Sequence, residues 1–167
     1  MAEAAVQLRE AVREDIPLVL RFIEKKAGFD GAADAVEATE ESLLRTIFGD
    51  PPLAHVLLAE IDGRAVGFAS YFFSYSTFLA RPGFWLDDLY VDADVRSRGV
   101  GRAILTRLAH LARRRGCGRI EWTAAVTNER GLAFYRRNGA AVRERTRLCR
   151  LDAAAIDGLA SGHDEEA

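Results

Sequence analysis

Apolar residues recur along the chain in short runs, some with the two-residue period of a strand and some with helical spacing. The clearest helix has apolar residues at 104, 105, 108, 111 and 112 and ends near residue 115, before Gly116. Asp62-Gly63 separates two β-compatible runs, as in a two-residue hairpin turn. The pattern predicts further helices over 15–27, 39–48 and 129–138, and strands over 6–10, 55–60, 65–74, 84–91 and 119–126.

This order of elements predicts one α+β domain over residues 1–160, in which a mixed central β-sheet is flanked by helices. A chain of 167 residues is long enough to bury one full core. Residues 140–151 have the pattern of one or two more strands, and 152–160 that of a terminal helical turn. The polar residues 161–167 are expected to form a disordered tail.

Two adjacent acidic residues, Asp87 and Asp88, interrupt the apolar strand over 84–91. Successive polar residues break the alternation of a strand, which indicates a β-bulge. A bulge would splay this central strand from its neighbour and free the backbone N–H groups around Leu89 and Val91. The alternative is that one acid is exposed and the other forms a turn or caps a helix.

The same strand leads into Arg96-Ser97-Arg98-Gly99-Val100-Gly101, a glycine-bearing loop at the start of a helix. Such a loop presents unpaired N–H groups at the positive end of the helix dipole, where a pyrophosphate binds. Arg102 and the two loop arginines add charged donors. The known nucleotide fingerprints do not match, because residue 104 is Ile and no Gly-Lys-Ser/Thr is present. A tight turn on a basic surface remains the alternative.

Composition and charge narrow the functional classes. The net charge of −2 gives no indication of general nucleic-acid or membrane binding. Eight arginines and no acidic residue stand between Arg96 and Arg119, so a nucleic-acid-binding helix stays open, although it would not explain the glycines. Two cysteines without metal or redox spacing and three scattered histidines predict no metal site. Without a recognisable signal peptide or membrane-spanning run, we expect a cytoplasmic protein.

A second motif follows the loop helix, with the form Asn-x₅-Phe-Tyr-x₃-Gly-Ala over residues 128–140. Together with Arg-x-x-Gly-x-Gly and the order of elements from about 6 to 151, it resembles the GNAT superfamily of N-acetyltransferases. Four stretches resemble the spermidine/spermine N-acetyltransferase-like (diamine acetyltransferase) group in particular: residues 29–30, 75–78, 85–91 and 134–140. The chain departs from that group by Asp-Asp in place of Glu-Asp, and by Glu144-Arg145-Thr146 in place of Glu-x-Trp.

The resemblance implies acetyl-CoA as co-substrate and assigns roles to residues of this sequence. Tyr135 would be the general acid that protonates the leaving thiolate, and Asp87 would act near the attacking amine as a base through water. The residues implied for cofactor binding are Leu89, Tyr90, Val91, Arg96, Arg98, Gly99, Val100, Gly101, Arg102 and Asn128. The residues implied for acceptor binding are Phe29, Asp30, Asp87, Asp88 and Glu144.

The expected reaction is acetyl transfer to a small di- or polyamine-like acceptor, by direct attack in a ternary complex. A lysine-like amine of pKa ~10.4 costs roughly 4 kcal/mol to deprotonate at neutral pH, so proton removal is a substantial part of the task. Two alternatives stay open: a protein lysine or N-terminal acetyltransferase, and a non-catalytic acyl-CoA-binding module. The resemblance also implies a homodimer. From charge and residue spacing we expect no nucleic-acid or membrane partner and no metal.

Overall fold

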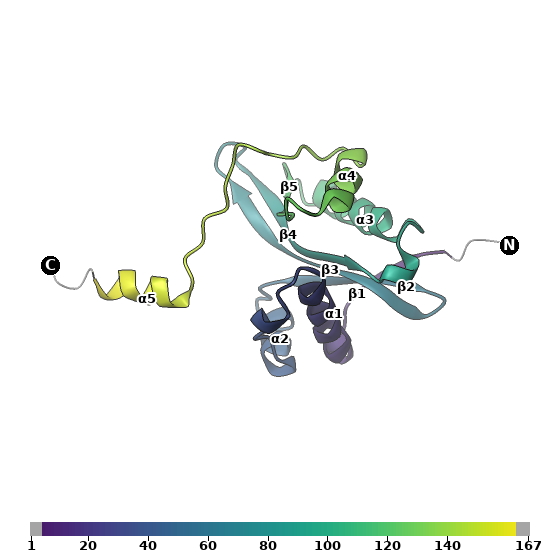
Figure 1. Cartoon of the computed structure of the whole chain (residues 1–167), viewed down its shortest axis with the longest axis horizontal. Helices are drawn as coiled ribbons and strands as arrows, with labels where there is room; N and C mark the ends of the chain where they lie inside the picture. The colour runs from purple at the N-terminus through teal and green to yellow at the C-terminus, as the bar shows by residue number, and fades with distance from the viewer. Residues whose placement is uncertain (1–4, 163–167) are drawn as a thin grey trace. The chain divides into compact units, whose positions relative to one another are not determined.

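The computed structural model describes residues 5–162, and the chain divides into two compact units at residue 128. The first unit contains the sheet and the three helices that cover it (Figure 1). Its elements are β1 (Gln7–Glu10), α1 (Ile16–Phe29), α2 (Glu40–Ile47), β2 (His55–Ile61), β3 (Arg64–Ser76), β4 (Arg81–Val91), α3 (Val100–Arg114) and β5 (Ile120–Glu121). The second unit contains α4 (Glu129–Arg137) and α5 (Ala153–Ser161).

The sheet has five strands in the order β1-β2-β3-β4-β5. The first four strands are antiparallel to one another, and β5 is parallel to β4. The predicted mixed sheet flanked by helices is therefore confirmed. The Asp62-Gly63 hairpin joins β2 to β3, and both residues have the positive φ angles, 51° and 74°, of the expected tight turn.

Apolar side chains pack on both faces of this sheet. Alternate residues of a strand point to opposite faces, so neighbouring residues of β2 enter different cores. Leu57 packs with Ile104 and Leu108 of α3. Leu58 packs on the other face with Phe22 of α1 and Phe68, whose rings stack at 5.4 Å. Figure 1 shows α1 and α2 on one face and α3 on the other. The strand β4 is thus held between two helices.

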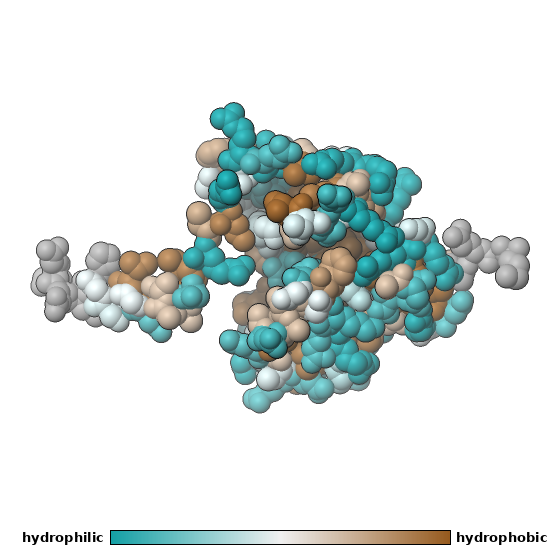
Figure 2. All heavy atoms as spheres, in the orientation of Figure 1, coloured by the Kyte–Doolittle hydropathy of each residue, from teal (hydrophilic) through white to brown (hydrophobic). Residues whose placement is uncertain are grey.

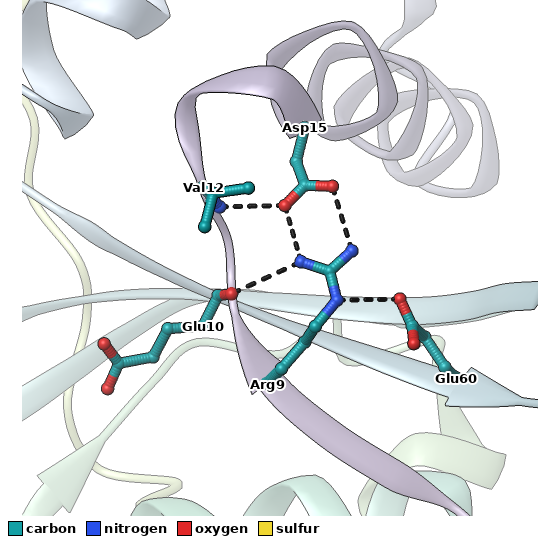
Figure 3. A network of polar contacts seen from close by, with 5 residues as sticks. All are labelled: Arg9, Glu10, Val12, Asp15 and Glu60. Atoms are coloured by element: carbon teal, nitrogen blue, oxygen red, sulfur yellow. Dashed lines mark hydrogen bonds and ion pairs between the residues drawn. The ribbon is translucent and has the colours of Figure 1, made fainter. Parts of the chain in front are cut away.

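A polar network fixes the start of α1 to the sheet (Figure 3). The Arg9 guanidinium donates to both carboxylate oxygens of Asp15, at 2.6 and 2.9 Å, and to Glu60 Oε1 at 2.8 Å. The N–H of Val12 also donates to Asp15, at 2.8 Å. These bonds lower the pKa of Asp15, with the Arg9 hydrogen bond as the largest cause. The paired arginine orients α1 on β1 and β2.

Two strand predictions are wrong: one strand is shorter than expected, and the other is absent. The strand expected over 119–126 is only Ile120–Glu121, because pairing with β4 ends after Trp85. Residues 140–151 form no strand, and within the described part of the second unit no neighbouring strand is present to pair with them.

The predicted terminal helical turn is α5, which extends through Ser161, one residue into the expected tail. It bears exposed apolar side chains, seen in brown over α5 in Figure 2. The rest of that tail, 163–167, lies outside the described residues.

Candidate active site

The two acidic residues of β4 lie at a β-bulge, as the sequence predicted. Ser70 of β3 pairs with Asp88, and the next residue, Tyr71, pairs with Leu86. Asp87 is therefore the extra residue on β4, and it is exposed while Leu86 is buried. A bulge of this kind bends the strand and increases its local twist.

Beyond the bulge, β4 separates from its parallel neighbour. The strand β5 pairs with β4 at Phe84 and Trp85 only. On the other edge, the N–H of Asp92 donates to the carbonyl of Val66 at 2.8 Å. Since the bonds of an antiparallel ladder alternate along a strand, Leu89 and Val91 direct their N–H groups away from β3. No strand within residues 5–128 takes up these two groups. They remain as donors on the splayed edge of β4.

The loop after β4 leads directly into the N-terminus of α3. Gly99 is the N-cap and has a φ of +80°, and a Cβ at this position would meet no atom within 4 Å. The backbone conformation, rather than the space, therefore favours glycine here. No side chain caps the helix, and Ala103 makes the first intrahelical bond, to the Gly99 carbonyl. The N–H groups of the first turn are thus available to an anion, which fits a pyrophosphate.

The arginines of this loop differ in their surroundings. Arg96 donates from Nε to the Val91 carbonyl at 2.9 Å, and its guanidinium lies 4.8 Å from the centre of the Phe29 ring and 5.6 Å from that of Tyr90. Arg98 and Arg102 are exposed beside the helix N-terminus. Arg96 therefore fastens the loop to β4 and to the end of α1. Its contact with a cofactor stays a prediction, as do those of the other two arginines.

A groove of about 460 Å³ begins at the same helix end. It runs along α3 from Gly99 and Arg102 past Thr106 to His110, with Leu8 of β1 on its far side. We call it the α3 groove.

On the α1 face of β4, carboxylates gather around one ammonium group. Lys26 pairs with Asp30, one helical turn away, and its Nζ lies 4.0 Å from Oδ1 of Asp88. Ser70 Oγ donates to the other oxygen of Asp88 at 3.2 Å. Burial, and secondly the negative charge of Asp87, raise the pKa of Asp88 above its usual value, although Lys26 and Ser70 oppose the shift. Lys26 was not among the predicted site residues, and its (i, i+4) spacing to Asp30 was the available signal.

The predicted acceptor residues of α1 also reach β4. The ring of Phe29 meets that of Tyr90 edge to face, with 6.5 Å between centroids. The fold thus brings Phe29, Asp30, Asp88 and Tyr90 together, with Asp87 on the bulge beside them.

Three predicted residues lie at or beyond the boundary between the units. Asn128 is half-buried, and its N–H donates to the Ala125 carbonyl at 2.9 Å. Tyr135 is half-buried on α4, with its ring 5.3 Å from that of Phe134. Glu144 is exposed and lies 3.7 Å from Arg136. The roles assigned to these residues remain predictions.

The bulged strand β4 leads into a helix that has a glycine N-cap and no side-chain cap, and this arrangement agrees with the family that the sequence motifs resemble. The chain matches the family model described as "Acetyltransferase (GNAT) family" over residues 20–140, and it belongs to that acetyltransferase family. Within the family it is similar to the spermidine/spermine N-acetyltransferase-like group, in agreement with the sequence motifs. The chain is therefore an acetyltransferase.

Two curated relatives and one solved structure illustrate the similarity. Thialysine N-epsilon-acetyltransferase of Bos taurus is 34% identical over 145 residues, which cover 82% of this chain and 85% of the relative. Spermidine/spermine N(1)-acetyltransferase-like protein 1 of Homo sapiens is 33% identical over 141 residues, or 80% of this chain and 20% of the longer relative. An integron cassette protein from the mobile metagenome of V. cholerae has the same fold, with a TM-score of 0.75, 25% identity, and coverage of 93% of this chain and 97% of that one.

None of the helices described between residues 5 and 162 is both long and apolar enough to cross a membrane. In the same part of the chain, no group of three or more His, Cys, Asp or Glu side chains is placed to hold a metal ion.

Proposed function

We propose that the protein transfers the acetyl group of acetyl-CoA to the amine of a small di- or polyamine-like acceptor, by direct attack in a ternary complex. The observation that carries the proposal is the placement of two N–H groups on the splayed edge of β4 directly before the uncapped N-terminus of α3. The thioester carbonyl needs the N–H donors on the edge of β4, and the pyrophosphate needs the N–H groups at the N-terminus of α3.

The cofactor site extends along the backbone from β4 into α3. The N–H groups of Gly99, Val100, Gly101 and Arg102 hold the pyrophosphate, and Arg98 adds charge at the rim. Acetyl-CoA supplies the acetyl thioester. The N–H groups of Leu89 and Val91 hold its carbonyl oxygen, and fixed donors aimed at a developing negative charge contribute about 10²–10³ in rate.

The acceptor site lies on the α1 side of the bulge. The ammonium of the acceptor must lose a proton before it attacks, and the exposed carboxylate of Asp87 receives it through a water. Asp30 and Asp88 attract the distal charged group of the acceptor, with Phe29 at the edge and Glu144 as a further carboxylate. Tyr135 returns a proton to the departing thiolate; such general acids contribute about 10²–10⁴-fold. The names of the two curated relatives, which specify thialysine and spermidine/spermine, support a small amine acceptor.

The test is an acetyl-CoA turnover screen across polyamines, lysine analogues, aminoglycosides and peptides, with the thiol released as the signal. The proposal predicts higher efficiency on a small molecule with a second charged group than on a monoamine of equal length. Equal rates on monoamines, or activity confined to peptides, would contradict the acceptor assignment and favour a protein acetyltransferase. Binding of acetyl-CoA without any turnover would indicate a non-catalytic module.

The family resemblance also supports a homodimer, and the charge and composition of the sequence support a cytoplasmic protein with no nucleic-acid or membrane partner. Sedimentation velocity tests the first point, because a single-chain mass at micromolar concentration would contradict it.

A further inference from the structure

The side chain of Arg96 joins the cofactor loop, residues 92–99, to two elements that precede it in the chain. Its guanidinium carbon lies 4.8 Å from the centre of the Phe29 ring, at the end of α1, and 5.6 Å from that of the Tyr90 ring on β4. Its Nε donates to the carbonyl of Val91 at 2.9 Å. These three partners lie outside the loop, so the side chain anchors the loop to α1 and β4.

The backbone that follows Arg96 has a conformation that needs such an anchor. Ser97 has a φ of +72° and Gly99 a φ of +80°. A left-handed residue other than glycine is strained, and it persists only where its surroundings hold it. The nearby bond from the N–H of Arg98 to the Val95 carbonyl is long, at 3.3 Å. The side chain of Arg96 therefore helps to hold the loop in the shape that presents the N–H groups of α3 to an anion.

Phe29 belongs to both proposed sites. Its ring meets that of Tyr90 edge to face at 6.5 Å and contacts Arg96, yet the residue is 51% exposed. The next residue, Asp30, is one of the carboxylates of the proposed acceptor site. An acceptor bound there would cover the exposed part of the ring, and the exclusion of water strengthens the attraction between a cation and a ring. One aromatic side chain thus connects the acceptor site to the cofactor loop.

We propose that Arg96 is a positioning residue that couples Phe29 to the cofactor loop, so that a side chain of the acceptor site sets the affinity for coenzyme A without touching it. The inference rests on the proposed function, which places the two sites, and adds an energetic link between them. Because linkage is reciprocal, the acceptor and coenzyme A each tighten the binding of the other by the same factor. Arg96 acts through the backbone of the loop and not through a direct contact with the pyrophosphate.

The experiment is a double-mutant cycle on the Kd of coenzyme A, measured by calorimetry without any acceptor. Phe29→Leu should weaken binding about fivefold, the equivalent of one partly exposed contact between a cation and a ring. Arg96→Met, which also loses the bond to the Val91 carbonyl, should weaken binding at least about tenfold. In the Arg96→Met background, the Phe29 substitution should change the Kd by less than about twofold, because the ring no longer has a cation to hold. Phe29→Tyr keeps the ring and should keep the wild-type affinity.

Phe48 provides the matched control. The guanidinium of Arg13 lies 5.5 Å from the centre of its ring and donates to its carbonyl at 2.8 Å, before the start of α1. Because α1 has 14 residues and is therefore about 20 Å long, this contact is remote from the loop. Phe48→Leu removes a ring from an arginine in the same way and should leave the Kd within about twofold of the wild type. An equal loss of affinity in both variants would indicate a general loss of stability and would contradict the proposal.

Two results overturn the coupling. One is an unchanged Kd in Phe29→Leu, and the other is a pair of losses that add in the double variant, since additive losses indicate independent direct contacts. Should Arg96→Met fail to fold, hydrogen exchange of the Arg98 amide provides the test: it should be faster in Phe29→Leu than in the wild type or Phe48→Leu, and equal rates would contradict the proposal. In each of these cases coenzyme A still binds, so the proposed function stands. A wild-type protein that binds no coenzyme A overturns both.

Discussion

Deletion of Asp87 tests the bulge without disturbing the core. Residues on either side keep their partners, because Asp88 stays opposite Ser70 and Leu86 stays opposite Tyr71. Leu86 already faces the core under α3, and Asp88 already faces α1. Removal of the residue between them therefore makes the ladder regular and leaves every buried side chain on its own face. We expect a folded protein whose free energy of unfolding changes by about 1 kcal/mol or less, which is a shift of about 2–4 °C in Tm.

The same deletion should abolish most of the activity. A regular β4 has no reason to separate from β5, so the N–H groups of Leu89 and Val91 would lose the geometry proposed to hold the acetyl carbonyl. Loss of one such donor lowers kcat by about 10²–10³. The matched control is Asp87→Ala, which removes the same carboxylate but keeps the extra residue and thus the bulge.

The assay is kcat from thiol release at saturating acetyl-CoA, with circular dichroism and thermal unfolding on the same samples. The deletion variant should turn over at least about 100-fold more slowly than Asp87→Ala. A folded deletion variant as active as Asp87→Ala would refute the reasoning, because the carboxylate and not the backbone would then account for the loss.

Three further substitutions probe the loop, the proposed proton donor Tyr135 and the half-buried Asp88. Gly101→Val should weaken acetyl-CoA binding about tenfold in calorimetry, since a branched side chain blocks the approach of the backbone to the pyrophosphate, and unchanged affinity in a folded variant would contradict this. Tyr135→Phe should lower kcat at least about 100-fold with little change in acetyl-CoA affinity, and full turnover would reduce Tyr135 to a packing role. Because folding raises the pKa of Asp88, its charged form opposes folding at neutral pH, and that opposition disappears as the pH falls through the raised pKa. Asp88→Asn should therefore raise Tm at neutral pH and leave it nearly unchanged at about pH 4, and an equal or lower Tm at neutral pH would contradict the raised pKa.

The features that the sequence predicted well depend on local chemistry. The Asp62-Gly63 turn needs positive φ angles at both positions, which these residue types tolerate, and the bulge follows from two adjacent acids in one apolar strand. The start of α3 follows from Gly99 as a left-handed N-cap. In each case a few neighbouring residues determine the backbone.

The features that could not be predicted from the sequence depend on segments that lie far apart in the chain. The strand β5 is two residues long because the bulge on β4 ends the ladder, and nothing within residues 119–126 encodes that limit. Lys26 reaches Asp88 only because α1 packs on the face of β4 to which Asp88 points. Its pairing with Asp30 was predictable from helical spacing, but its approach to Asp88 was not.

The most direct test of the central claim is the change in the backbone amide resonances of the labelled protein on titration with acetyl-CoA. The account predicts the largest ¹H and ¹⁵N shifts at Leu89, Val91 and Gly99–Arg102, since these N–H groups are the proposed donors to the carbonyl and the pyrophosphate. Shifts confined to the far part of the α3 groove, around Leu8 and His110, with none on β4, would contradict it.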